Sequence, residues 1–158
     1  MEGGAGTDFL SMDGTSAAES YSVTPVGGRA RAARDTEIVD LGDVERLDVL
    51  PAGGADQMHV ADMSGTDVDH VDFLLTLARG STTRDGSADS VRVDGTNGSD
   101  AVSVTAGGSF VSTSGLAAIT TVGFGDKTQD RLHVHTKLGN DLISVDPLVH
   151  QQLLFTSS

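Results

Sequence analysis

Gly95-Thr96-Asn97-Gly98-Ser99-Asp100-Ala101-Val102-Ser103-Val104 is the stretch that decides how this chain is expected to fold. Its glycines precede a small polar residue and an aspartate, a composition typical of tight turns. After the aspartate, apolar and polar residues alternate, which places Val102 and Val104 on one face and Ser103 on the other. The stretch therefore predicts a glycine-aspartate turn that leads into a short, half-buried strand.

The same turn-and-strand pattern recurs along the chain. Related units begin at five further positions, namely Gly3, Gly53, Asp89, Asp130 and Leu138. Residues 45–49 also match residues 130–134, and residues 54–60 then match residues 139–145 in the same register. Internal repetition with short strands and glycine turns is typical of solenoids. The sequence predicts an all-β fold, a parallel β-helix or β-solenoid of short strands joined by Gly/Asp turns, with an ordinary β-sandwich as the alternative.

The predicted solenoid is a single domain over residues 1–158, and we expect it to be a segment of a larger repeat protein. A repeat unit begins at Gly3, and nothing before it could cap the stack. Residues 13–35 contain Gly27-Gly28 and a basic cluster, so we expect an irregular loop there. A brief turn of helix is expected near residues 149–154, because glycine recurs too often elsewhere to propagate one.

The composition limits the classes of function. The chain has 23 acidic and 10 basic residues, for a net charge of −13, which repels nucleic acid and anionic lipid and suits cations or basic partners. It has no cysteine, which excludes disulfides and thiolate metal sites. Aromatic residues make up 4 % of the chain, too few for a large aromatic-lined pocket. The longest apolar run, residues 73–78, is too short to span a membrane.

The first residues, Met1-Glu2-Gly3-Gly4, have neither the basic nor the apolar region of a signal peptide. The protein is then cytosolic, or its export is directed from elsewhere, or the chain is a piece of a longer protein. We favour the last interpretation and expect a secreted or cell-surface protein.

The turns resemble the haemolysin-type calcium-binding repeats (RTX-like proteins), whose nonapeptide is Gly-Gly-x-Gly-x-Asp-x-apolar-x. Residues 3–11 match every fixed position, and residues 95–103 keep two glycines and the aspartate but have Thr96 at the second position. The resemblance implies calcium as the cofactor, held by aspartate carboxylates and glycine carbonyls where turns stack, since calcium takes six to eight oxygens. The ligands that it implies are Gly6, Asp8, Asp56, Gly98, Asp100, Gly139 and Asp141.

A structural role is the alternative for the turn aspartates. Their carboxylates can accept hydrogen bonds from turn amides and so fix the corner before each strand. This interpretation applies to Asp8, Asp56, Asp89, Asp100, Asp130 and Asp141.

The pattern favours a non-enzymatic function, a structural spacer or adhesive module. Its expected partners are calcium ions, other solenoid segments bound end to end, or cell-surface carbohydrate, with no nucleic acid and no membrane span. The alternative is a carbohydrate-active β-helix, a polysaccharide lyase or hydrolase with Arg46, His59, Arg131 and His133 on one groove. A metal site of His133 and His135 with His59 has no recognised spacing, and no nucleophile elbow, phosphate loop or His-Glu-x-x-His motif is present.

Overall fold

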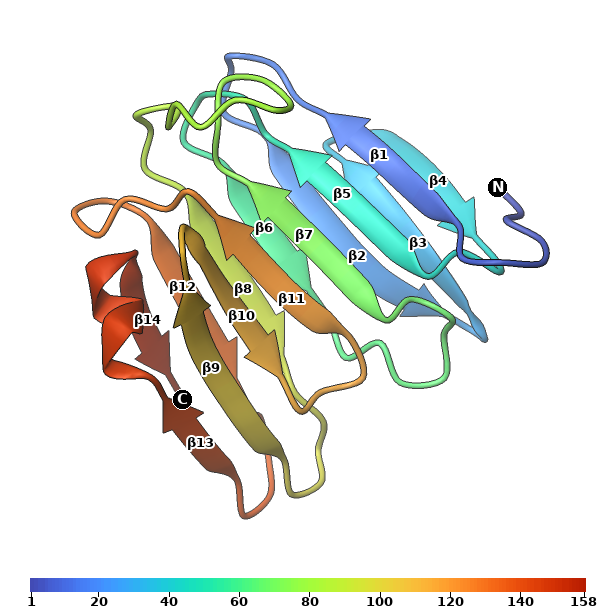
Figure 1. Ribbon diagram of the computed structural model, residues 1–158. Helices are drawn as coiled ribbons and strands as arrows, with labels where there is room; N and C mark the ends of the chain where they lie inside the picture. The colour runs from blue at the N-terminus through green and yellow to red at the C-terminus, as the bar shows by residue number, and fades with distance from the viewer.

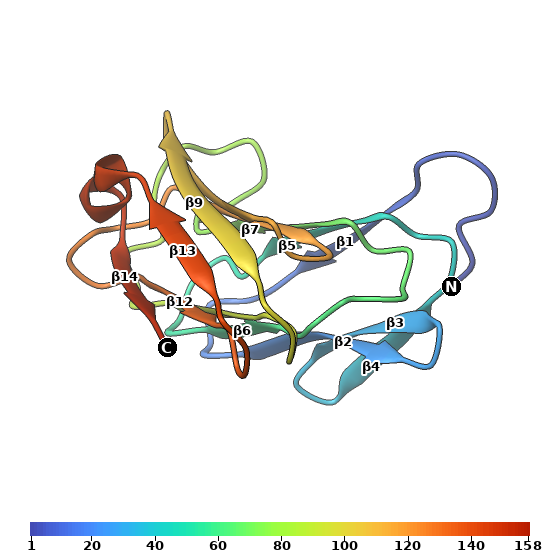
Figure 2. The same cartoon turned by 90° about the horizontal axis from the view of Figure 1, so that it is seen from below.

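The computed structural model describes all of residues 1–158. It contains fourteen short strands and one 3-10 helix, η1 (Pro147–Gln151). The strands build two seven-stranded sheets that lie face to face (Figures 1 and 2). The first sheet has the order β1 (Phe9–Asp13), β5 (Arg46–Leu50), β7 (His70–Leu74), β11 (Ile119–Gly123), β10 (Phe110–Ser114), β9 (Ala101–Gly107) and β13 (Leu142–Val145). The second has the order β14 (Leu154–Ser157), β12 (Arg131–His135), β8 (Ser90–Asp94), β6 (Gln57–Val60), β2 (Ser20–Val26), β3 (Arg29–Arg34) and β4 (Glu37–Leu41).

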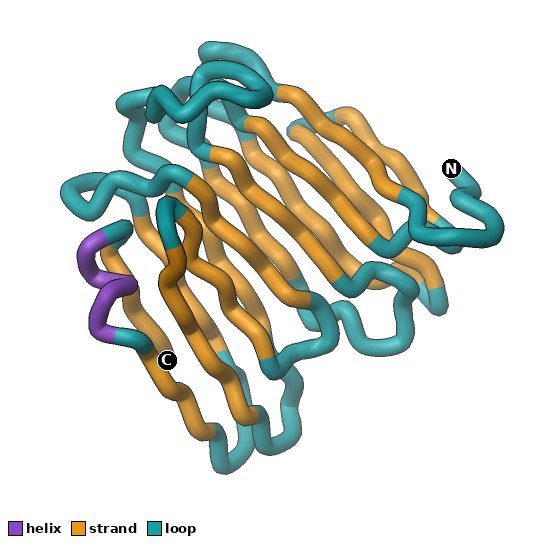
Figure 3. The backbone as a smooth tube through the Cα atoms, in the orientation of Figure 1, coloured by secondary structure: helices purple, strands orange, loops and turns teal.

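The chain passes repeatedly from one sheet to the other, so its connections gather at the two ends of the strands (Figure 3). Neighbours within a sheet pair in parallel except where β3 meets β2 and β4, and where β10 meets β9 and β11. Six of the seven strands in each sheet therefore run in one direction. The corners that precede parallel neighbours consequently stack on one another.

Both sheets bury alternate residues against each other, as the half-buried strand pattern predicts. On β12, for example, Leu132 and Val134 are fully buried, whereas Arg131 is exposed. Twenty-six of the buried apolar residues form a single cluster, which includes Val102 and Leu132, and Ile143 packs against it. The apolar residues that follow the acidic corners thus share one interior. Each fully buried side chain contributes about 1.5–3 kcal/mol to stability.

The prediction of a parallel β-helix or β-solenoid is wrong. The sheets are mixed, and together they form a β-sandwich-like fold, the alternative considered from the sequence. Two-residue hairpin turns, Gly27-Gly28 and Gly108-Ser109, cause the difference because they reverse the chain within one sheet. Gly27 and Gly108 have φ of 65° and 61°, a conformation that glycine adopts readily and that tight hairpins require.

Two local expectations also differ from the structure. The expected irregular loop of residues 13–35 contains the whole hairpin of β2 and β3. The expected helical turn near residues 149–154 is η1, which lies slightly earlier and is followed by β14. Asp146 caps η1, because its carboxylate accepts a hydrogen bond from Leu148 N–H at 2.8 Å. The structure contains no helix that is long and apolar enough to cross a membrane.

Candidate functional site

An acidic residue stands immediately before nine of the fourteen strands, at the corner through which the chain enters the strand. These residues are Asp8, Glu19, Glu45, Asp56, Asp69, Asp89, Asp100, Asp130 and Asp141. Because parallel neighbours pair in register, the acids of adjacent layers lie next to one another.

Four of these acids, Glu19, Asp56, Asp89 and Asp130, form a hydrogen-bonded column that we call the acidic ladder. They precede β2, β6, β8 and β12, which lie side by side in Figure 1. Glu19 N–H donates to Asp56 Oδ1 at 2.7 Å, Asp56 N–H to Asp89 Oδ1 at 2.9 Å, and Asp89 N–H to Asp130 Oδ1 at 3.0 Å. Hydrogen bonds to charged groups contribute about 1.5–3 kcal/mol each, so the ladder fixes the spacing of the corners.

The first sheet uses the same contact in two places. Asp8 N–H donates to Glu45 Oε2 at 2.7 Å, and Asp100 N–H donates to Asp141 Oδ1 at 2.9 Å. The structural role expected for the turn aspartates is therefore confirmed for Asp141, as it is for the three aspartates of the ladder. The Asp8 carboxylate differs, because its Oδ2 is buried without a hydrogen-bond partner.

At several corners the acid also closes its own turn. Thr15 N–H donates to Glu19 Oε2 at 2.9 Å, and Asp126 N–H donates to Asp130 Oδ2 at 2.6 Å. Thr96 N–H donates likewise to Asp100 Oδ2 at 2.9 Å, which confirms the capping role of Asp100. Both carboxylate oxygens are thus satisfied by an amide four residues earlier and by the neighbouring layer or the turn itself.

Asp56 and Asp89 lack this second contact. Each is 1 % exposed, and its Oδ2 is buried with no hydrogen-bond partner. Asp85 lies beside them, and its own Oδ2 is also buried without a partner, while Oδ1 accepts from Ser87 N–H at 3.1 Å. One carboxylate oxygen from each of the three aspartates lies within 4.8 Å of the other two. We call these three residues the aspartate cluster.

Burial and mutual repulsion perturb the carboxyls at this corner. Burial is the main cause that raises the pKa of Asp89 to about 8. The hydrogen bond from Asp56 N–H acts to lower this pKa, and the charges of Asp85 and Asp130 act to raise it. Burial likewise raises the pKa of Asp56 to about 6. The pKa of Asp130 is raised as well, again mainly by burial. The corner therefore holds carboxyls that ionise at an electrostatic cost.

The calcium ligands implied by the sequence do not meet in one place. Asp100 and Asp141 are adjacent in the first sheet with Gly98 and Gly139 in their corners, but Asp8 and Gly6 lie at β1 on the far edge of the same sheet. Asp56 belongs to the second sheet. Only Asp56, of the implied aspartates, lies in the aspartate cluster.

Sequence reasoning missed Asp85 as a site residue and Glu19 as a member of the ladder. Both lie in a five-residue corner whose first and last side chains are polar: Thr15 to Glu19, Asp85 to Asp89, Thr96 to Asp100, and Asp126 to Asp130. The first side chain accepts the N–H of the third residue in each case. This spacing was the signal that could have found both residues.

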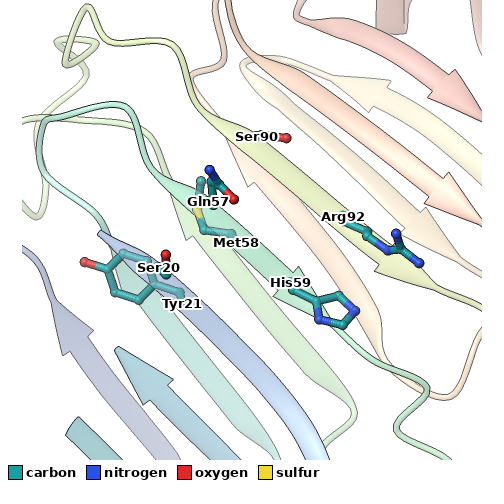
Figure 4. A pocket seen from close by; sticks show the side chains of 7 residues that line it. All are labelled: Ser20, Tyr21, Gln57, Met58, His59, Ser90 and Arg92. Atoms are coloured by element: carbon teal, nitrogen blue, oxygen red, sulfur yellow. The ribbon is translucent and has the colours of Figure 1, made fainter. Parts of the chain in front are cut away.

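A second group of polar residues lies on the outer face of the second sheet. His59, Arg92 and His133 occupy one register row across β6, β8 and β12. A shallow pocket of about 290 Å³ borders this row, and Figure 4 shows the side chains that line it: Ser20, Tyr21, Gln57, Met58, His59, Ser90 and Arg92. Burial, with the charges of Arg92 and His135, lowers the pKa of His133.

Asp94 anchors this row. Its carboxylate lies 2.7 Å from Arg92 Nε, 3.2 Å from His59 Nε2 and 3.6 Å from His135 Nδ1. Burial acts to raise the pKa of Asp94, but Arg92 and His59 lower it overall. The groove of four residues considered from the sequence does not form, because Arg46 lies on β5 of the other sheet and pairs with Asp72 at 3.0 Å.

Comparison with protein-family models, with curated protein sequences and with solved structures found no match. The resemblance to RTX-like repeats therefore stays a prediction.

Replacing Asp130 with alanine tests the ladder. The amides of Asp89 and Asp126 would lose their acceptor, and each orphaned buried N–H costs about 1–3 kcal/mol. We expect Asp130→Ala to lower the free energy of unfolding by about 2 kcal/mol or more in urea denaturation. Asp130→Asn is the matched control, since it keeps an acceptor oxygen and should cost clearly less. Equal costs for the two variants would contradict a hydrogen-bonding role.

The raised pKa values predict an unusual pH dependence in buffer that contains a chelator. Asp89 and Asp56 bind protons more tightly when folded than at the unfolded value of about 3.9, so the free energy of unfolding falls as pH rises from about 4 to about 8. Below that window both states are protonated, and above it the folded state carries the full cost. We expect a loss on the order of a few kcal/mol between pH 5 and pH 8.5 in urea denaturation, since one pKa unit is worth about 1.4 kcal/mol.

Asp89→Asn provides the control for this pH dependence. Its amide keeps an acceptor for Asp56 N–H but no longer titrates. The variant should therefore show a flatter decline in stability over the same pH range. An unchanged slope would show that other groups cause the decline.

Proposed function

We propose that this chain is a non-enzymatic structural module, a rigid spacer or adhesive segment of a secreted or cell-surface protein. The acidic ladder is the observation that carries the proposal, because it commits the acids at successive corners to joining one layer to the next. These contacts between neighbouring corners would keep such a module rigid.

The two ends of the sandwich support association with further modules. At one end the edge strands are β1 and β4, and at the other they are β13 and β14. Apolar side chains are only half-buried there, including Leu10 and Val39 at the first end, and Ile143 and Phe155 at the second. Open edges and incompletely covered apolar residues favour pairing with another chain.

Strand direction fits such an arrangement. Pairing within the first sheet makes β13 parallel to β1, and pairing within the second makes β14 parallel to β4. A second copy placed head to tail would therefore continue both sheets with parallel neighbours. The contact would be heterologous, with different surfaces on the two partners.

Sedimentation analysis over a range of protein concentrations tests this arrangement. We expect the wild-type chain to form dimers and longer species, and Leu10→Lys or Ile143→Lys to weaken the association by blocking one end. A mixture of the two variants should give a heterodimer and nothing longer, because each variant retains the opposite end. A monomer at all concentrations, with native circular dichroism, would contradict end-to-end association.

A carbohydrate-active function is the second candidate, and the row of His59, Arg92 and His133 favours it. These residues put basic side chains on central strands of an otherwise acidic molecule, beside a pocket. Incubation with acidic polysaccharides separates the two proposals. Chain cleavage by the wild type that His133→Ala abolishes would favour the enzyme, whereas binding without cleavage would favour the adhesive module.

A further inference from the structure

The aspartate cluster differs from the two ends of the acidic ladder in the state of its carboxylates. Outside the cluster, one aspartate oxygen is also buried without a partner, Asp8 Oδ2 in the first sheet. Elsewhere in the ladder, Glu19 and Asp130 have both oxygens engaged by amides or hydroxyls. In the cluster, Asp56, Asp85 and Asp89 each keep one buried oxygen without a partner. None of the ion pairs in the chain includes one of these three residues.

Three adjacent carboxylates without a counter-charge, two of them buried and Asp85 half-buried, are costly because they lose hydration and repel one another. A bound cation removes both costs at once. The chemistry of the cluster selects among cations, since all three side chains offer oxygen and no histidine belongs to the group. Oxygen-only sets suit hard divalent ions rather than zinc or copper.

We propose that Asp56, Asp85 and Asp89 form a binding site for a hard divalent cation, with Ca²⁺ as the fitting ion. Ca²⁺ accepts irregular sets of six to eight oxygens, whereas Mg²⁺ demands near-ideal octahedral geometry. The three carboxylates supply part of the shell, and water and backbone carbonyls complete it. This cation site is a separate proposal from the spacer role, because the acidic ladder supports that role without any bound ion.

The site would hold the longest connection between strands in the chain. Residues 75–89 link β7 to β8, and Asp85 lies near the end of this segment. Asp56 belongs to the adjacent corner, before β6. A cation bound by both corners therefore fastens the connection to the acidic ladder and stabilises the folded state by linkage.

Terbium luminescence offers a direct test, because Tb³⁺ is a hard oxygen-seeking ion and tyrosine sensitises its emission at short range. Tyr21 is the one tyrosine, and the chain has no tryptophan. Its hydroxyl donates to Glu19 Oε2 at 2.8 Å, and Glu19 N–H donates to Asp56 at 2.7 Å. Excitation of Tyr21 in the full chain should therefore produce Tb³⁺ emission that added Ca²⁺ displaces.

Asp85→Asn is the decisive variant. Its amide keeps an oxygen for Ser87 N–H but removes one ligand charge. Asp126→Asn is the matched control, since Asp126 holds the equivalent place in the next corner and caps Thr128 instead. We expect the sensitised emission to be lost in Asp85→Asn and kept in Asp126→Asn.

Thermal unfolding supplies an independent readout. Ca²⁺ at about a hundred times its Kd should raise the melting temperature of the wild type and of Asp126→Asn by about 5–10 °C relative to chelator. Asp85→Asn should show no such rise, yet in chelator it should melt at or above the wild-type temperature because one repelling charge is gone. Wild-type protein with neither sensitised emission nor a Ca²⁺-dependent melting shift would overturn the site and leave the spacer proposal intact.

Discussion

The hydrogen bond from the backbone N–H of one corner acid to the carboxylate of the next is the interaction on which this structure depends. The amides of Glu19, Asp56 and Asp89 lie where sheet pairing begins and have no backbone carbonyl as acceptor, so each needs another acceptor. The carboxylate of the next layer supplies it and fixes the register of Ser20, Gln57, Ser90 and Arg131 across four strands. A slip by one residue would turn the aliphatic side chains of these strands to the solvent, so the same contact also defines the interior.

Stacking acids in this way brings like charges close together, and each further layer adds to their repulsion. Glu19, at one end of the ladder, disperses its charge to the amide of Thr15 and the hydroxyls of Thr15 and Tyr21. Asp130, at the other end, uses the amides of Asp89 and Asp126. Asp56 and Asp89, in the two middle layers, have no such second donor for their carboxylates. Asp85 adds a third carboxylate beside them instead of a hydrogen-bond donor. Local departures from a structural rule tend to mark functional positions, and within the acidic ladder this departure is confined to the two neighbouring middle corners.

Much of the local structure could be predicted from the sequence, because strand alternation and glycine-aspartate turns are local signals. The connectivity could not. Residues 45–49 and 130–134 match in sequence, yet β5 lies in the first sheet and β12 in the second, and the matched strands β6 and β13 are exchanged in the same way. The repeating unit is one corner with one strand, which looks the same on either sheet. The hairpin of β2 and β3 was missed because the sequence of β3, Arg-Ala-Arg-Ala-Ala-Arg, lacks β-branched residues, although Ala30 and Ala32 face the interior. Asp85 was overlooked because one of its two neighbours in the aspartate cluster, Asp56, lies in a different corner that is distant in the sequence.

The position of the acids nevertheless encodes the connectivity. Nine strands follow a crossing between the sheets, and eight of them begin after an acid, the exception being β14, which follows η1. The four strands entered through a hairpin, β3, β4, β10 and β11, follow Gly28, Thr36, Ser109 and Ala118 instead. A hairpin satisfies its own strand-start amides through pairing with the strand just completed. After a crossing the amide of the corner acid finds its acceptor elsewhere: a carboxylate of the next layer at four corners and a backbone carbonyl at three others. From β2 onward, an acid immediately before a strand therefore marks a change of sheet, and each return within the same sheet lacks that acid.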